Sequence, residues 1–209
     1  YQHALFPYAL ANIDLRAKEI KSERKTLSLV RVGTCGSVQA EVPVNAFVIS
    51  AASIGIDGVL RFYKGHERVC DEWMEDAFIH HCQWTPKAAR PYAVKAAKEL
   101  VDKLYQPGLA YKGITLTANG FYGPQGRVLR LPIEMPGVNE AINTFHHDGL
   151  PLVNYEMESA PLAGLAALMG HKAATICLVI ANRATGDSNP DYQPRMEELI
   201  EYTLNKLIE

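Results

Sequence analysis

The stretch LSLVRVGTCGS, from Leu27 to Ser37, joins an apolar segment to a turn rich in glycine and hydroxyl groups. Its first part, LSLVRV, has the composition of a short buried β-strand, and Gly33 and Gly36 are expected to end that strand. In open α/β sheets, ligands bind in the crevice outside the carboxyl ends of strands. The stretch therefore predicts an α/β fold that carries ligand-binding residues at the end of a strand.

Strand-like and helix-like segments alternate along the chain, which is the pattern of an α/β domain. Strands are predicted at residues 27–32, 46–51, 113–118 and 174–180. Helices are predicted at residues 86–105, 157–169 and 197–208. The 209 residues contain no repeat, no low-complexity block and no linker rich in Gly, Ser and Pro, so we expect one domain over residues 1–209.

The composition argues against several kinds of partner. Lysine and arginine together number 21, and aspartate and glutamate number 23, so no net field favours nucleic acid or an anionic membrane. The longest apolar runs are far shorter than the roughly 20 residues that span a bilayer. We therefore expect neither nucleic acid nor a membrane as a partner.

Cysteine usage bears on location and on metal binding. Cys35, Cys70, Cys82 and Cys177 form no C-x-x-C pair, and no histidine or cysteine spacing fits a zinc site. Reduced thiols in a cytosolic protein are the simplest interpretation. We therefore expect a cytoplasmic location and no bound metal.

Arg31 is a charged residue inside the apolar strand at residues 27–32. A buried cation is costly unless it is paired or reaches a ligand. The glycines that follow let backbone N–H groups approach closely, and Thr34 and Ser37 add hydroxyls, a combination that suits phosphate. The same residues also fit a strand-end turn in which Arg31 makes a structural salt bridge.

Residues 119–127, NGFYGPQGR, form a glycine-rich segment after the strand at residues 113–118. Gln125 offers a donor and an acceptor, and Arg127 offers donors only. Phe121 can stack on a flat ring. The three side chains match a flat heterocycle with an acceptor–donor–acceptor edge, as in uracil. A surface loop with solvated side chains is the alternative.

Two acids, Glu156 and Glu158, flank Met157 where a predicted helix begins. Residues two apart do not share a helix face, so one acid can reach a pocket while the other caps or solvates the helix start. Glu158 would suit a sugar if it accepted from vicinal hydroxyls. An ordinary acidic helix start is the alternative.

Polar or glycine residues follow three predicted strands at once, at residues 31–37, 118–127 and 180–183. The last of these segments ends in Arg183. Because ligands bind outside the carboxyl ends of strands in α/β sheets, we expect the three segments to face one pocket.

Taken together, these segments resemble the nucleoside phosphorylase superfamily, and within it the uridine phosphorylases. Residues 30–36 resemble its phosphate-binding turn, residues 121–127 its pyrimidine-binding loop, residues 155–159 its ribose-binding segment and residues 180–183 a pocket-lining strand end. Each segment alone is weakly specific, but the four occur in the family's order. The resemblance implies a single-domain three-layer α/β/α sandwich with a central mixed β-sheet.

The resemblance also implies a role for individual residues. Arg31, Gln125 and Arg127 are predicted as catalytic. Arg31 would hold phosphate, Gln125 would bond N3 and O2 of uracil, and Arg127 would bond O4. The predicted substrate-binding residues also include Gly33 and Thr34 in the phosphate turn, Phe121, Ile180, Ala181 and Arg183 around the base, and Glu156, Met157 and Glu158 in the ribose segment.

The implied reaction is phosphorolysis of uridine to uracil and ribose 1-phosphate, with phosphate as a co-substrate and no cofactor. Purine phosphorylases and methylthioadenosine-type hydrolases of the superfamily place an aspartate near the stretch 179–183, to protonate the leaving purine. Here that stretch reads VIANR, without an acid. Their loops also lack the Gln/Arg pair, so both features favour a pyrimidine.

One part of the family pattern is missing. Members normally begin with a strand and a glycine-containing loop that add phosphate contacts, and residues 1–10 match that portion poorly. We therefore expect the chain to lack the N-terminal portion and part of the phosphate site. The resemblance also implies a homodimer or a hexamer built as a trimer of dimers. A hydrolase of the same fold and a non-catalytic nucleoside-binding paralogue stay open as alternatives.

Overall fold

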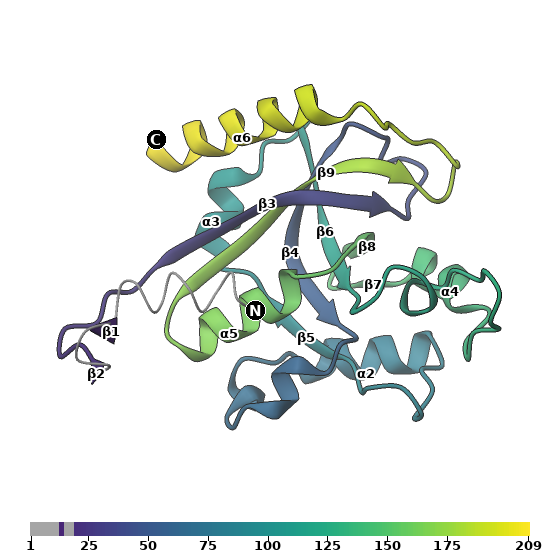
Figure 1. The fold of residues 1–209 in the computed structure, drawn as a ribbon, viewed down its shortest axis with the longest axis horizontal. Helices are drawn as coiled ribbons and strands as arrows, with labels where there is room; N and C mark the ends of the chain where they lie inside the picture. Colours follow the sequence, from purple (N-terminus) through teal and green to yellow (C-terminus); the bar gives the residue numbers. More distant parts are fainter. Residues whose placement is uncertain (1–12, 15–18) are drawn as a thin grey trace.

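The computed structural model describes residues 13–14 and 19–209, so the predicted departure from the family pattern at residues 1–10 lies outside the described part. Figure 1 shows how the elements are arranged. In chain order they are β1 (Ile13–Asp14), β2 (Glu19–Ile20), β3 (Ser28–Ser37), β4 (Phe47–Gly55), η1 (Val59–Phe62), η2 (His66–Arg68), α2 (Glu72–His81), β5 (Tyr92–Lys95), α3 (Lys98–Leu104), β6 (Ala110–Thr117), η3 (Gly123–Gln125), α4 (Val138–Thr144), β7 (His146–His147), β8 (Leu150–Glu156), α5 (Ser159–Leu168), β9 (Lys172–Asn182) and α6 (Gln193–Ile208).

The strands from β3 to β9 pair in one mixed sheet, in the order β3-β9-β4-β6-β8-β7, with β5 alongside β4. β3 runs parallel to β9, and β6 runs parallel to both β4 and β8. β9 and β4 are antiparallel. A further antiparallel pairing joins Gly36 and Ser37 of β3 to Tyr155 and Asn154 of β8, which closes the main strands into a circuit. The predicted α/β fold with a central mixed sheet is confirmed.

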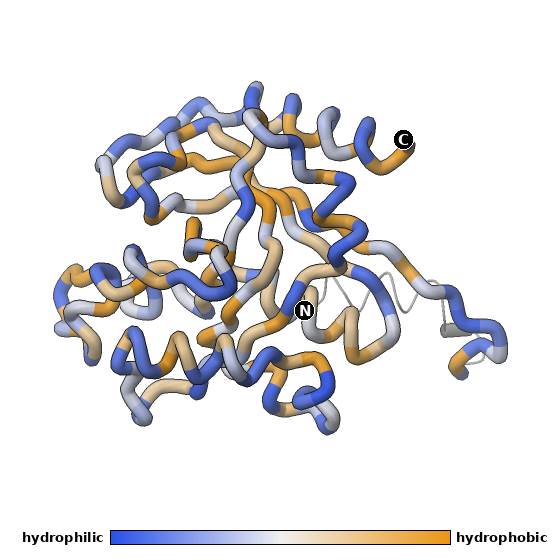
Figure 2. The backbone as a smooth tube through the Cα atoms, turned by 180° about the vertical axis from the view of Figure 1, so that it is seen from behind, coloured by the Kyte–Doolittle hydropathy of each residue, from blue (hydrophilic) through white to orange (hydrophobic). Residues whose placement is uncertain are grey.

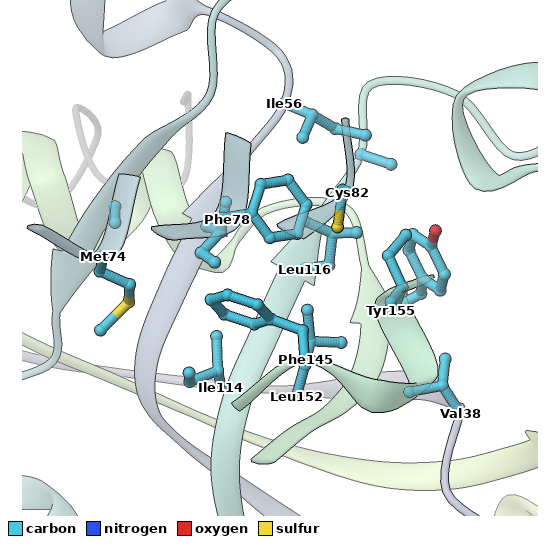
Figure 3. Packing of buried hydrophobic residues seen from close by; sticks show 14 of the residues in the cluster. Val38, Ile56, Met74, Phe78, Cys82, Ile114, Leu116, Phe145, Leu152 and Tyr155 are labelled. Carbon is cyan, nitrogen blue, oxygen red and sulfur yellow. The ribbon is translucent and has the colours of Figure 1, made fainter. Parts of the chain in front are cut away.

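Helices cover the strands on two sides, with α3 and α6 on one and α2 and α5 on the other (Figure 1). Leu100 of α3 and Leu199 of α6 share a buried cluster with Phe47 of β4 and Ile176 of β9. Phe78 of α2 belongs to a second cluster, shown in Figure 3, that includes side chains of β4, β6 and β8. Figure 2 shows hydrophobic residues along the inner strands, whereas the outer turns carry a mixture of hydrophilic and hydrophobic residues.

The predicted helix at residues 86–105 is wrong in its first half. The strand β5 lies there and pairs antiparallel with β4, and only α3 is helical. Pro91 opposes a continuous helix, and Tyr92 and Val94 favour a strand. All three residues from Tyr92 to Val94 are buried. Periodicity alone cannot separate such a fully buried strand from a buried helix.

β3 continues to Ser37 instead of ending at Val32. The expectation that Gly33 and Gly36 end the strand is wrong, because β9 keeps pairing with this stretch across a bulge that follows Cys35. Gly33 serves a different purpose. A Cβ at Gly33 would lie only 2.8 Å from Nη1 of Arg31, so the glycine makes room for the arginine side chain against its own strand.

Among the described helices, none is both long and apolar enough to cross a bilayer. The longest of them, α6, has 16 residues, against the roughly 20 that a spanning helix needs. The cysteines Cys35, Cys70, Cys82 and Cys177 are free thiols.

Candidate active site

Arg31 lies on β3 with its guanidinium against two acids at the end of β8 and the start of α5. Its Nη1 lies 3.3 Å from Oε2 of Glu156, and its Nη2 donates to Oε2 of Glu158. Nη1 also donates to Sγ of Cys177, at 3.3 Å. Burial alone would lower the pKa of Arg31, but Cys177, Glu156 and Glu158 together raise it, so the guanidinium stays charged. The structural salt bridge that the sequence left open is therefore present.

Glu156 and Glu158 have different surroundings, as expected for two residues that do not share a helix face. Glu156 is buried, and its Oε2 accepts from the backbone N–H groups of Glu158 and Ser159, both at 2.8 Å. Its Oε1 accepts from the hydroxyls of Thr117, at 2.5 Å, and Ser159, at 2.7 Å. The side chain of Glu158 is 38% exposed and lies next to the exposed Met157. Glu156 thus holds the start of α5, and Glu158 is the more accessible acid. The predicted substrate contact of Glu156 stays a prediction.

Gln125 is buried although it belongs to η3, in the glycine-rich segment 119–127, which we call the base loop. Arg183 donates from Nη2 to Oε1 of Gln125, and from Nη1 to its main-chain oxygen at 2.9 Å. The guanidinium carbon of Arg183 lies 4.2 Å from the ring centroid of Tyr155. Burial, with Arg127 nearby, lowers the pKa of Arg183 to about 10. The alternative of a solvated loop therefore does not hold for Gln125.

Arg127 folds back onto Phe121 within the base loop. Its Nη1 donates to the main-chain oxygen of Phe121 at 3.0 Å, and its guanidinium carbon lies 3.8 Å from the ring centroid. Phe121 is itself 54% exposed. A flat ligand that stacks on the same face of Phe121 has to displace the guanidinium. The predicted contacts of Phe121 and Arg127 with one ligand therefore require either a movement of Arg127 or the opposite face of the ring.

The ends of β3, β6, β8 and β9 meet at this point. Gly36 of β3 pairs with Tyr155 of β8, and Thr117 of β6 pairs with Glu156. A Cβ at Gly36 would lie 3.4 Å from Nε of Arg183, so Arg183 sits between the end of β3 and the base loop. The remaining predicted residues on these strands are half-buried: Thr34, Ile180 and Ala181.

A cavity of about 880 Å³ opens beside the base loop. Tyr122 and Arg127 line it from the loop, and Trp84 and Ile133 line it from the segments on the other side. Of the residues predicted as catalytic, the cavity includes only Arg127. Within the described part of the chain, no three His, Cys, Asp or Glu side chains gather closely enough to hold a metal ion.

The sequence motifs do not single out two residues that hold the base loop. The hydroxyl of Tyr155 donates to Oδ1 of Asn139 at 3.1 Å, and Nδ2 of Asn139 donates to the main-chain oxygen of Gly126 at 3.3 Å. Tyr155 adjoins Glu156 in a segment that the sequence does mark. Asn139 lies on α4, whose short sequence carries no motif, so it is found only from the structure.

The model of the phosphorylase superfamily matches residues 11–207, and the chain therefore belongs to that superfamily. This confirms the predicted family. Its relatives differ in the nucleoside that they are named for. A uridine phosphorylase of Thermococcus kodakarensis is 27% identical over 167 residues, covering 77% of this chain and 50% of the relative. A DeoD-type purine nucleoside phosphorylase of Shewanella loihica is 28% identical over 203 residues, covering 95% and 71%.

Solved structures agree with the fold. A Trypanosoma brucei nucleoside phosphorylase described as showing uridine phosphorylase activity superposes with a TM-score of 0.78 at 21% identity, covering 96% of this chain and 73% of that one. A uridine phosphorylase of the oomycete Phytophthora capsici gives a TM-score of 0.56 at 19% identity, covering 88% and 67%. The chain thus spans half of the Thermococcus relative and about two thirds to three quarters of the other relatives described.

Proposed function

We propose that this chain forms the catalytic core of a nucleoside phosphorylase that cleaves uridine with phosphate, giving uracil and ribose 1-phosphate. The observation that carries the proposal is the buried amide of Gln125, held by Arg183, with a second guanidinium from Arg127 on the same loop. An amide and an arginine taken out of water without a charged partner are costly. Their presence at a meeting point of strand ends supports a role in recognising a polar ligand.

The donors of this loop suit the carbonyl groups of uracil. Arg183 occupies Oε1 of Gln125, which directs the Nε2 amino group of Gln125 toward other partners. Nε2 and the guanidinium of Arg127 are donors that can reach two carbonyl oxygens, and Oε1 keeps a second lone pair for an N–H group. Cleavage leaves negative charge on uracil, and preorganised donors of this kind stabilise such charge.

The ribose and the phosphate are assigned to Glu158 and Arg31. Glu158 is the more accessible of the two acids and can accept from the sugar hydroxyls. Arg31 carries one positive charge against the two carboxylates of Glu156 and Glu158. A phosphate dianion at this point therefore needs at least one further cation. In the proposed family assembly, a homodimer or a trimer of dimers, a neighbouring subunit contributes to the site.

The choice of uridine over a purine nucleoside is supported by the end of β9. Residues 179–183 read VIANR, so this strand end offers no carboxyl group to protonate a leaving purine. Arg183 instead donates to Gln125. Because DeoD-type purine nucleoside phosphorylases are among the relatives, a purine nucleoside should be tested alongside uridine.

The test is an ultraviolet assay of uridine, thymidine, inosine and methylthioadenosine, each with and without phosphate. We expect uridine cleavage that depends on phosphate, with ribose 1-phosphate as the second product. Faster cleavage of inosine than of uridine contradicts the base assignment. Equal cleavage of uridine in phosphate-free buffer contradicts phosphorolysis and favours the hydrolase, an outcome that the ion-paired state of Arg31 makes worth measuring.

A further inference from the structure

The turn at Gln125 and Gly126 is packed against the side chain of Asn139 on α4. Gly126 has a φ of +70°, and a Cβ there would lie 2.3 Å from Nδ2 of Asn139. The positive φ and the close approach both favour glycine at this position. The close approach puts the amide of Asn139 directly on the turn that precedes Arg127.

Asn139 is held in one orientation by its hydrogen bonds. Its Oδ1 accepts from the hydroxyl of Tyr155 at 3.1 Å. The two main-chain oxygens that face the other end of the amide can only accept, so Nδ2 must point to them and Oδ1 must point to the hydroxyl. Nδ2 of Asn139 is then left to donate to the main-chain oxygens of Gly126, at 3.3 Å, and Gln125, at 3.5 Å.

Tyr155 contacts both Asn139 and Arg183, the two side chains that donate to Gln125. Its side chain belongs to the buried cluster in Figure 3 and lies at one edge of it. The ring carries the guanidinium of Arg183, and that guanidinium donates to both oxygens of Gln125. One rigid tyrosine therefore supports two donors, Asn139 and Arg183, that bracket the same residue of the base loop.

We propose that Asn139 is a positioning residue of the site: with Tyr155 it clamps the turn at Gln125 and Gly126 and so sets the directions of Gln125 and Arg127. Beside the donors of Arg183 and the backbone hydrogen bonds of the turn itself, Asn139 adds a contact to Gly126 from a separate helix. η3 has only three residues, and the neighbouring side chains of Phe121, Tyr122 and Val128 are exposed. The catalytic part of this inference rests on the proposed function, whereas the clamp itself does not.

The sharpest test is Asn139→Asp, which keeps the shape of the side chain and replaces the donor with an acceptor. The new oxygen faces two carbonyl oxygens and repels them, which should release the turn. Asn143→Asp, at an exposed position of the same helix, is the matched control with the same change of charge. Asn139→Ala removes the donor without adding charge, and it decides the matter if the aspartate variant does not fold.

Two readouts separate the clamp from the proposed function. Amide hydrogen exchange over residues 120–128, without substrate, should rise about tenfold in Asn139→Asp and Asn139→Ala, which is the effect of losing roughly 1.4 kcal/mol of hydrogen bonding. Exchange in β9 and in Asn143→Asp should be unchanged. Unchanged exchange of the loop in both Asn139 variants overturns the clamp, whether or not the parent chain cleaves any nucleoside.

The kinetic readout tests the positioning role. We expect KM for uridine to rise about tenfold in Asn139→Asp, with KM for phosphate unchanged. Tyr155→Phe should shift KM for uridine in the same direction, because it frees Asn139 to rotate. Faster loop exchange with an unchanged KM and kcat for uridine overturns the positioning role. If the parent chain does not cleave uridine, the proposed function is contradicted. The clamp is then tested by the hydrogen-exchange result alone.

Discussion

Replacing Arg183 by methionine distinguishes a residue kept for function from one kept for stability. Arg183 is half-buried, and its buried Nε has no hydrogen-bond partner among the described residues. Burial lowers its pKa to about 10, which means that the folded protein holds this charge at a cost. Methionine has a similar length and fills apolar space. Replacement of a buried charge by a well-packed apolar side chain is often neutral or stabilising.

The contacts of Arg183 allow the expected changes in melting temperature and in kcat/KM to be estimated. Arg183→Met removes two donors from Gln125 and the cation–π contact with Tyr155, but it also removes the burial cost of the charge. We expect these effects to offset, so that the melting temperature changes by less than about 4 °C, or roughly 1 kcal/mol. The freed amide of Gln125 should weaken recognition of the transition state by about 2 kcal/mol, which lowers kcat/KM for uridine about 30-fold.

The assay is steady-state phosphorolysis of uridine together with thermal unfolding. Arg195→Met is the control. The guanidinium carbon of Arg195 also lies over an aromatic ring, 4.3 Å from the centroid of Phe47, but Arg195 belongs to α6 and not to the candidate site. The control should leave kcat/KM unchanged. A fall of less than about threefold in Arg183→Met shows that Arg183 does not set Gln125. A drop in melting temperature of more than about 8 °C assigns Arg183 to stability instead.

Three further variants test other parts of the molecule. Arg127→Ala should lower kcat/KM for uridine about 100-fold without changing the melting temperature, since Arg127 contacts the exposed Phe121; unchanged kinetics remove base recognition from this loop. Glu156→Gln removes the charge of a buried carboxylate that accepts from two backbone N–H groups and pairs with Arg31, and urea titration should show a loss of about 3 kcal/mol of unfolding free energy; a loss below about 1 kcal/mol contradicts its role at the start of α5. Burial raises the pKa of Asp57, so the folded state binds that proton more tightly and native stability falls as pH rises through the raised pKa. Asp57→Asn should therefore gain in melting temperature relative to the parent as pH rises above the ordinary pKa of an aspartate, and a difference that does not vary with pH contradicts the assignment.

The parts of the fold that the sequence predicts are those with a clear period or a strong break. The strand around residues 174–180 is a run rich in β-branched residues without a glycine or proline, and it forms the middle of β9. The small-residue helix expected at residues 157–169 forms as α5. The stretch around Tyr92 fails because β5 is buried on both sides, so its apolar residues carry no alternation.

The candidate site is predictable in its residues and not in their contacts. The sequence places Gln125 and Arg127 on one loop, but nothing in it says that Arg183 holds Gln125 or that Arg127 lies on Phe121. Those contacts depend on how strand ends far apart in sequence meet. Asn139 escapes sequence analysis for the same reason, since its partners are the turn at Gly126 and a tyrosine on β8.

The contacts of Arg31 link the two halves of the proposed reaction. Two unit charges about 4 Å apart interact with about 4 kcal/mol at the effective dielectric of a protein surface, so Glu158 and an arriving phosphate compete for Arg31 on comparable terms. On the proposed function, an Arg31 that turns to phosphate leaves the carboxylate of Glu158 free to accept from the ribose hydroxyls. The salt bridge is the state that the structure shows, and the phosphate contact is the state that the proposal adds. On the proposed function, phosphate and nucleoside should each raise the affinity of the site for the other.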